Sequence, residues 1–243
     1  QNCMADLLQN SFVKGKLIHS RRGEKRGDVV FLDDYATLIQ ALLDLYESDF
    51  NLSHLNTARR LAGEMLERFG ENPDQHLTLA PKDQPSKISA QIILNDGVTP
   101  TGNSSALVAL HRLALFSADA KLEDEASKRL HNLGSYLEES PANSPELLWV
   151  LDFTPDSAKE VIIVGPLGDK TTKQLIKTVN NHFIPGLILA GVDSSTKPNE
   201  LSQWPLLNRS MIDNRPTAYV CKNLVCRLPV FTPEELEKML VEN

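Results

Sequence analysis

The sequence predicts a mainly α-helical protein in which a helical part, residues 1–154, is followed by a small α/β unit, residues 155–243. Three observations lead to this prediction. Before Pro155, apolar residues recur at three- and four-residue steps in several long segments, which is the period of a helix. Two short apolar runs, 160–165 and 186–192, follow Pro155. One amphipathic segment, 170–182, lies between them, and this order is typical of a βαβ unit.

Segment 31–50 is predicted to form the buried helix around which the rest of the chain is arranged. Its apolar residues lie on nearly all sides, so it should pack among other helices rather than on a surface. Asp33 and Asp34 fall in its first turn, where free amide groups and the helix dipole favour negative charge. The next helix, to about residue 69, is apolar on one side only, and Ser53 is its predicted N-cap.

The same pair of helix types recurs further along the chain. A second buried helix is predicted at 106–116 and a second one-sided helix at about 119–138, and a third apolar helix, 145–153, begins another pair. Hairpins of this kind suit an α/α toroid, in which inner helices contact neighbours on every side. Two hairpins and part of a third cannot close a ring. Either partner segments lie outside this chain, or the fold is an open stack.

Shorter signals predict the remaining segments. Residues 232–235 combine a capping box with a proline at the first helical position, and they should open a terminal helix. The basic cluster 21–26 is interpreted as a solvated loop rather than a phosphate site, because two glycines break it up. Further predictions are an N-terminal helix with an extended piece at 16–20, a long loop at 70–93 with a strand at 88–94, and an extended pair or third strand at 217–230.

Composition narrows the possible functions. The 243 residues carry a net charge of -7, which argues against nucleic acid or an anionic membrane as a partner. No apolar run approaches the roughly 20 residues that cross a bilayer, and the start of the chain shows no signal-peptide pattern. Three cysteines do not form a secreted disulfide framework, so a cytoplasmic location is expected. The chain begins with Gln1, and we expect it to be a fragment of a longer protein.

Three motifs occur in one order: 31–36 with 42–47, then 96–104, then 218–230. Together they resemble the C-terminal part of the spermatogenesis-associated protein 20 family and its bacterial homologues, over essentially the whole chain. The resemblance implies a six-hairpin, glycosidase-like α/α toroid in a thioredoxin-domain-containing protein. It also implies that the thioredoxin-like domain and the first part of the toroid lie outside this chain. The toroid is similar to those of N-acylglucosamine 2-epimerases and related sugar enzymes, which is a likeness of fold.

This sequence departs from the family in two places. Residues 71–85 are polar and proline-rich where the family has a glycine- and aromatic-rich strand. Thr101 stands where the family usually has a serine, and this exchange keeps the hydroxyl.

Candidate functional residues gather at the predicted starts of two buried helices. Inner helices of a toroid run parallel, so both starts should open on one concave mouth. Helix dipoles pointing at that mouth would favour an anionic or hydroxyl-rich ligand. The residues at these starts, here called the mouth residues, are Asp33, Asp34, Tyr35, Asp96, Thr101 and Asn103.

Two interpretations of the mouth residues stay open. In the first, the carboxylates of Asp33, Asp34 and Asp96 act as acid and base on a sugar or similar polyol, in an epimerase- or glycosidase-like reaction. The other three mouth residues then bind this ligand. In the second, Asp33, Asp34 and Asn103 only cap helices, each stabilising its helix by about 1 kcal/mol. A non-enzymatic scaffold or a redox-coupled interaction module is the alternative function.

Cys221 and Cys226 are five residues apart, which is not the spacing of a Cys-x-x-Cys redox centre or a zinc knuckle. A metal would need further ligands nearby, so neither a metal nor a cofactor is expected. We predict reduced thiols packed in a strand pair. The alternative is a redox pair that reacts with the thioredoxin-like domain.

The loop 165–168 follows a strand and could dock a phosphate. A simple turn is preferred, because the loop lacks the residues of a P-loop.

Overall fold

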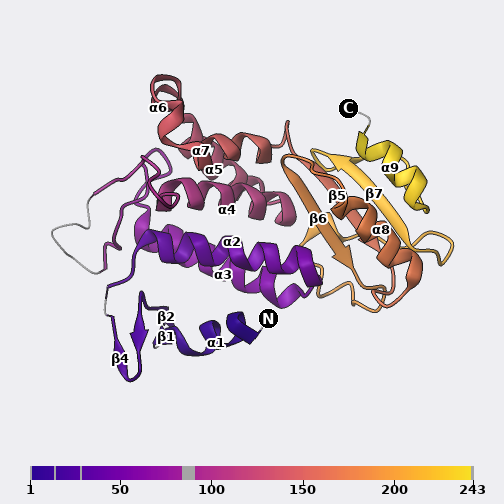
Figure 1. Ribbon diagram of the computed structural model, residues 1–243, viewed down its shortest axis with the longest axis horizontal. Coiled ribbons are helices and arrows are strands. Elements are labelled where there is room, and N and C mark those ends of the chain that lie inside the picture. The colour runs from indigo at the N-terminus through magenta and orange to yellow at the C-terminus, as the bar shows by residue number, and fades with distance from the viewer. Residues whose placement is uncertain (1, 14, 28, 84–90, 242–243) are drawn as a thin grey trace.

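The computed structural model describes residues 2–13, 15–27, 29–83 and 91–241, in which a layer of helices packs against one face of a small sheet (Figure 1). Helices α2 (Leu32–Asp49) and α4 (Gly102–Ser117) run side by side in the same direction. Their starts meet where Asp33 approaches Gly102, and their ends meet where the rings of Tyr46 and Phe116 lie 5.3 Å apart. Helix α3 (Leu52–Phe69) returns antiparallel against α2.

Burial follows the predicted alternation of buried and one-sided helices. All sixteen residues of α4 are buried, and α2 buries residues on most of its circumference. Helix α3 has only one buried side, and α5 (Ala120–His131), which follows α4, buries two residues. An apolar helix of this kind is stable only inside a layer, because its solvation by water would be unfavourable on every side.

Several element boundaries differ from the predictions. Asn51, not Ser53, caps α3, because the Asn51 side chain accepts a hydrogen bond from the Ser53 amide. The predicted helix 119–138 breaks after residue 131, before Gly134, and continues as α6 (Gly134–Glu139). Glycine weakens a helix interior, which explains a break at this place. The third apolar helix is α7 (Pro145–Trp149), followed by a 3₁₀ turn, Val150–Phe153.

The long connection between α3 and α4 is described in part. Residues 70–83 have no helix or strand. Of the strand predicted at 88–94, residues 88–90 lie outside the described residues, and residues 91–94 do not form a strand.

The N-terminal segment forms a helix and two small hairpins beside the helical layer. The basic residues of the second hairpin are all exposed, as predicted for a solvated cluster, but they lie on two paired strands rather than in a loop. The elements are α1 (Asn2–Asn10), β1 (Phe12–Val13), β2 (Lys16–Leu17), β3 (Arg21–Arg22) and β4 (Lys25–Arg26).

The C-terminal unit is a four-stranded mixed sheet with the order β6-β5-β7-β8. Strands β5 (Lys159–Val164) and β6 (Leu187–Val192) are parallel and connected through α8 (Lys170–Asn180), which is the predicted βαβ unit. Strand β7 (Thr217–Lys222) is antiparallel to β5 and forms a hairpin with β8 (Val225–Cys226). The last helix is α9 (Pro233–Val241). The structure therefore agrees with a mainly helical part followed by a small α/β unit.

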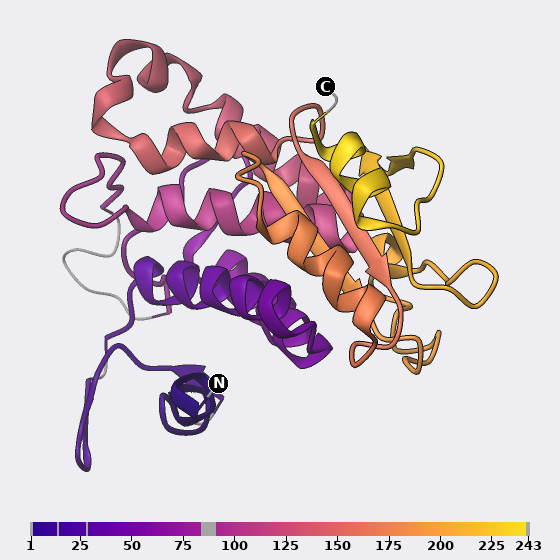
Figure 2. The same ribbon diagram turned by 45° about the vertical axis from the view of Figure 1, so that its right-hand side comes forward.

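The two faces of the sheet have different coverings (Figure 2). Val161 and Ile163 of β5 pack with Leu175 of α8 and Leu236 of α9. The opposite face belongs to the larger core that includes α2, α3 and α4. The Tyr46 hydroxyl of α2 donates a hydrogen bond to the Gly191 carbonyl of β6, at 3.1 Å, and so joins helices and sheet. No helix in the described ranges is long and apolar enough to span a bilayer.

Candidate functional site

The starts of α2 and α4 lie in direct contact at one end of the helical layer. A Cβ atom on Gly102 would lie 2.3 Å from Asp33 Oδ1 and 2.8 Å from Leu32 Cγ. Such distances are impossible between real atoms, so only glycine allows the two helices to approach this closely. Asp33 is thereby placed against the first residue of α4.

The two neighbouring acids on α2 have different environments. The Asp34 carboxylate accepts a hydrogen bond from the Phe31 amide, at 2.8 Å, and lies 3.0 Å from His19 Nδ1. It therefore caps the helix, as the second interpretation of the mouth residues requires. The Asp33 side chain is exposed. Desolvation by neighbouring atoms and the charge of Asp34 raise the pKa of Asp33, while the backbone amide of Gly102 acts in the opposite direction.

Asp96 joins the starts of two helices. One of its carboxylate oxygens accepts a hydrogen bond from the Thr101 amide, at 2.8 Å, and the other accepts from the Glu146 amide of α7, at 3.0 Å. Thr101 is the N-cap of α4, and its hydroxyl accepts from the Ser104 amide, at 3.2 Å. Both oxygens of Asp96 and the Thr101 hydroxyl thus bind backbone groups of the protein itself.

Asn103 and Tyr35 are both buried. The Asn103 side chain accepts a hydrogen bond from the Leu77 amide, at 3.0 Å, and donates to the Leu77 and Ile93 carbonyls. These hydrogen bonds hold the connection between α3 and α4 against the start of α4. The Tyr35 hydroxyl accepts from Arg68 Nη1, at 2.9 Å, and its ring is fully buried. Among the six mouth residues, Asp33 alone is exposed.

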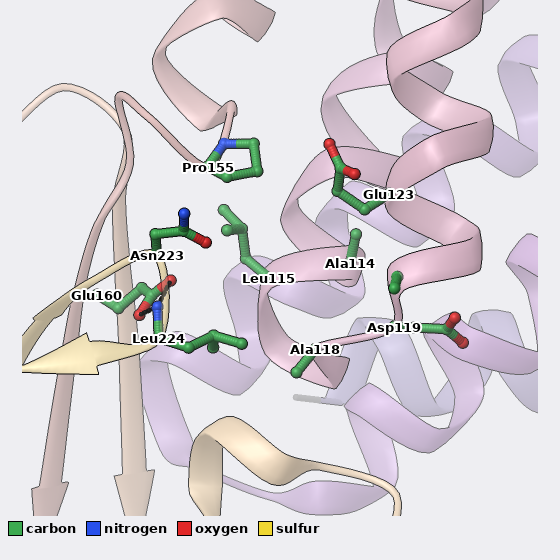
Figure 3. A pocket seen from close by; sticks show the side chains of 10 residues that line it. Ala114, Leu115, Ala118, Asp119, Glu123, Pro155, Glu160, Asn223 and Leu224 are labelled. Atoms are coloured by element: carbon green, nitrogen blue, oxygen red, sulfur yellow. Dashed lines mark hydrogen bonds between the residues drawn. The ribbon is translucent and has the colours of Figure 1, made fainter.

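A second feature, which the sequence did not indicate, is a cavity of about 180 Å³ between α4, α5 and the β7–β8 hairpin (Figure 3). Its walls are mainly apolar, with Glu123 on the helical side and Glu160 on the sheet side. Glu160 is fully buried, and its carboxylate accepts a hydrogen bond from the Leu224 amide, at 3.1 Å. Burial raises the pKa of Glu160, and this hydrogen bond and the charge of Arg209 act in the opposite direction.

Cys221 and Cys226 form a disulfide, so the prediction of reduced thiols is wrong. The reason is the register of the hairpin, which places the two residues directly opposite each other on β7 and β8. A two-residue turn, Asn223 and Leu224, makes this register possible, because both residues have positive φ angles of 50° and 62°. The five-residue spacing would have indicated this pairing, had the extended pair been recognised as a hairpin with a two-residue turn.

The phosphate-docking alternative for the loop 165–168 finds no support in the geometry. The Asp169 side chain caps α8 and accepts hydrogen bonds from the Thr171 and Thr172 amides, at 2.7 and 3.0 Å. A phosphate at this helix start would meet the charge of this carboxylate, so the loop is a turn as preferred. Within the described ranges, no three His, Cys, Asp or Glu side chains come close enough together to hold a metal ion.

The fold defines a class of protein in which two parallel buried helices meet at their starts, pack with one-sided helices and are joined to a small mixed α/β unit. No family model matches the chain. Over 212 residues it is 28% identical to human spermatogenesis-associated protein 20 and 27% identical to the mouse protein, a match that covers 86% of this chain. An uncharacterized protein of Caenorhabditis elegans is 26% identical over 211 residues, again 86% of this chain.

The predicted resemblance to the spermatogenesis-associated protein 20 family is confirmed by these comparisons. The match covers the C-terminal part of those relatives, and the chain spans only 27% of the length of the human protein.

Proposed function

We propose that this chain forms the C-terminal part of an α/α toroid and that its mouth binds a hydroxyl-rich, carbohydrate-type ligand. The observation that carries the proposal is the position of Asp33, which is exposed at the junction of two parallel helix starts. A carboxylate in this place can accept hydrogen bonds from the hydroxyl groups of a ligand. Helical segments outside this chain would complete the ring and the opposite wall of the mouth, in a protein of the cytoplasm.

Binding is favoured over an acid–base reaction within this chain. Hydrolysis of a glycoside commonly needs two carboxyl groups that both reach the scissile bond. Asp34 and Asp96 bind backbone amides and are half-buried, whereas Asp33, although the Gly102 amide lies near its carboxylate, is exposed to solvent. In this proposal the other mouth residues position Asp33 and the start of α4.

The test is a thermal-shift screen of neutral monosaccharides and disaccharides, because a ligand that binds only the folded state raises its melting temperature. The informative variant is Asp33→Asn, and Asp156→Asn is its matched control, since Asp156 is an exposed acid in the loop before β5. A sugar that stabilises the wild type and the control should not stabilise Asp33→Asn. An equal response of all three proteins would contradict the proposal.

A second candidate, a redox-coupled interaction module, is favoured by the disulfide between Cys221 and Cys226. In this role an external dithiol would reduce the disulfide to two thiols and would itself become a disulfide. Thiol titration of the folded protein should then detect one thiol, that of Cys3, before treatment with dithiothreitol and three after it. A disulfide that stays intact in the folded protein at millimolar dithiothreitol would exclude this candidate.

A further inference from the structure

The connections that leave β5 and β6 at their carboxyl ends go to opposite faces of the sheet. The loop after β5 leads to α8, whose Leu175 packs with Val161 and Ile163 on one face. The segment 193–216 after β6 crosses the other face, where Trp204 joins the core shared with the helical layer. In open α/β sheets, ligands bind in the crevice that forms where neighbouring connections diverge in this way.

A cavity of about 490 Å³ lies at this point of divergence. Its walls include the last residues of both parallel strands, Val164 and Val192, together with Tyr219 of β7 and part of the segment 193–216. The volume falls within the range of roughly 300–1,000 Å³ that is usual for small-molecule sites. The strand-end cavity, as we call it, lies near the C-terminal end of α2, so the length of that helix, about 27 Å, separates it from the mouth.

The strand-end cavity contains a cation, Arg209, whose hydrogen-bond partners in the described part of the chain are neutral groups. Arg209 Nη1 donates hydrogen bonds to the Asn208 and Pro205 carbonyls, at 3.1 and 3.4 Å, and Nη2 lies 3.6 Å from Cys226 Sγ. Among the described residues, no carboxylate forms an ion pair with Arg209. Its fixed position and the lack of a carboxylate in direct contact among the described residues suit an anionic group of a ligand, since guanidinium binds carboxylate and phosphate well.

Among the described residues that line the strand-end cavity, the acid is Asp193, and its carboxylate binds groups of the protein itself. The Asp193 carboxylate accepts hydrogen bonds from the Leu167 amide, at 3.0 Å, and from the Ser195 amide and hydroxyl, at 2.8 and 2.6 Å. These bonds hold the pKa of Asp193 below its ordinary value. Asp193 therefore fixes the loop after β5 to the end of β6 and keeps the rim of the cavity in shape.

Hydroxyl and amide groups complete the lining. The Tyr219 hydroxyl donates to the Ser210 carbonyl, at 2.7 Å, and can still accept a hydrogen bond. Ser194, Thr196 and Asn208 add further donors and acceptors. We propose that the strand-end cavity binds a small polyhydroxylated organic anion, whose phosphate or carboxylate lies on Arg209 and whose hydroxyl groups contact the polar rim.

Titration calorimetry at constant ionic strength tests this inference with glucose, glucose 6-phosphate and gluconate as probes. Glucose 6-phosphate, gluconate or both should bind the wild type, and the one that binds identifies the anionic group. Arg209→Gln removes the cation. Ser194→Asp adds a negative charge at an exposed rim position without removing a side-chain contact of the described structure. Both variants should weaken anion binding at least tenfold, whereas Arg22→Gln, a matched change in the exposed hairpin, should not.

The results separate this site from the mouth. Asp33→Asn should leave anion binding unchanged, and Arg209→Gln should leave the binding of neutral sugars unchanged. The inference is overturned if neither anion binds at millimolar concentration, or if Arg209→Gln and Ser194→Asp both bind it as tightly as the wild type. Circular dichroism of each variant shows whether it is folded. If Arg209→Gln does not fold, Ser194→Asp still decides the test.

Discussion

The mouth and the strand-end cavity both gather polar side chains, but the two regions use them differently. At the mouth, the side chains of Asp96 and Asn103 form hydrogen bonds with backbone groups of the same chain. At the strand-end cavity, Arg209 forms no ion pair with a carboxylate of the described residues and lies next to about 490 Å³ of space. Polar side chains at a helix start therefore indicate a structural role when they are hydrogen-bonded to the backbone. They indicate ligand binding only when they lack such partners within the protein.

The largest expected effect on stability comes from Asn103→Ala at the mouth. The substitution leaves the buried Leu77 amide and carbonyl without their partners, and each such loss costs about 1–3 kcal/mol. We expect a loss of about 3 kcal/mol in the free energy of unfolding, measured by urea denaturation.

The matched change at the strand-end cavity is Asn208→Ala. Its exposed side chain lines the cavity, and the substitution should alter stability by less than about 0.5 kcal/mol. If the two alanine variants were equally stable, the proposed contrast between the regions would be wrong.

A smaller loss, about 2 kcal/mol, is expected for Gly102→Ala. The new methyl group would overlap Asp33 and Leu32, and overpacking of this kind costs about 1–3 kcal/mol. Gly63→Ala in α3 is the control, because no atom lies within 4 Å of the added Cβ and alanine favours a helix. Thermal unfolding should therefore show a lower melting temperature for the first variant and a higher one for the second. A stable Gly102→Ala would mean that α2 and α4 do not meet as closely as described.

Asp34→Ala should cost about 1 kcal/mol, since it removes the acceptor of the Phe31 amide at the start of α2. Asp34→Asn keeps most of this capping and should cost less. Asp33→Ala should cost less than Asp34→Ala, because the Asp33 residue is exposed, even though the Gly102 amide lies near its carboxylate. Urea denaturation of the three variants checks the order. Should Asp34→Asn also leave sugar binding intact, a role of Asp34 in binding would be excluded.

Features that depend on local spacing could be predicted from the sequence. The 3.6-residue period marked the buried helices, and the capping box at 232–235 has the expected bonds, with Glu235 accepting from the Thr232 amide and Thr232 from the Glu235 amide. The partners of Asn103 could not be predicted, because Leu77 lies 26 residues away in a segment without any period. The strand-end cavity depends on where the segment 193–216 crosses the sheet, and no local pattern in the sequence contains that information.

The smallest expected effect is a change in how the free energy of unfolding depends on pH. The titrating group is Glu160, and because the charge of Arg209 acts on it, the measurement tests that charge. Burial raises the pKa of Glu160, so the folded state keeps this proton at pH values where the unfolded state has lost it. Stability from this group is fully present below the ordinary pKa of about 4.3 and is lost as pH rises through the raised pKa. Urea denaturation between pH 4 and 8 should show a smaller loss in Glu160→Gln than in the wild type, and the remainder comes from Glu47, whose pKa burial raises to about 7.

Arg209→Gln should enlarge the same loss, because the charge of Arg209 lowers the pKa of Glu160 in the wild type. Glu138→Gln, at an exposed position of α6, should leave the pH dependence as it is in the wild type. An anion bound in the strand-end cavity would partly neutralise Arg209 and should shift the wild type in the direction of Arg209→Gln. If Arg209→Gln had the same pH dependence as the wild type, the Arg209 charge would already be compensated, and the contrast between the two regions would lose its electrostatic basis.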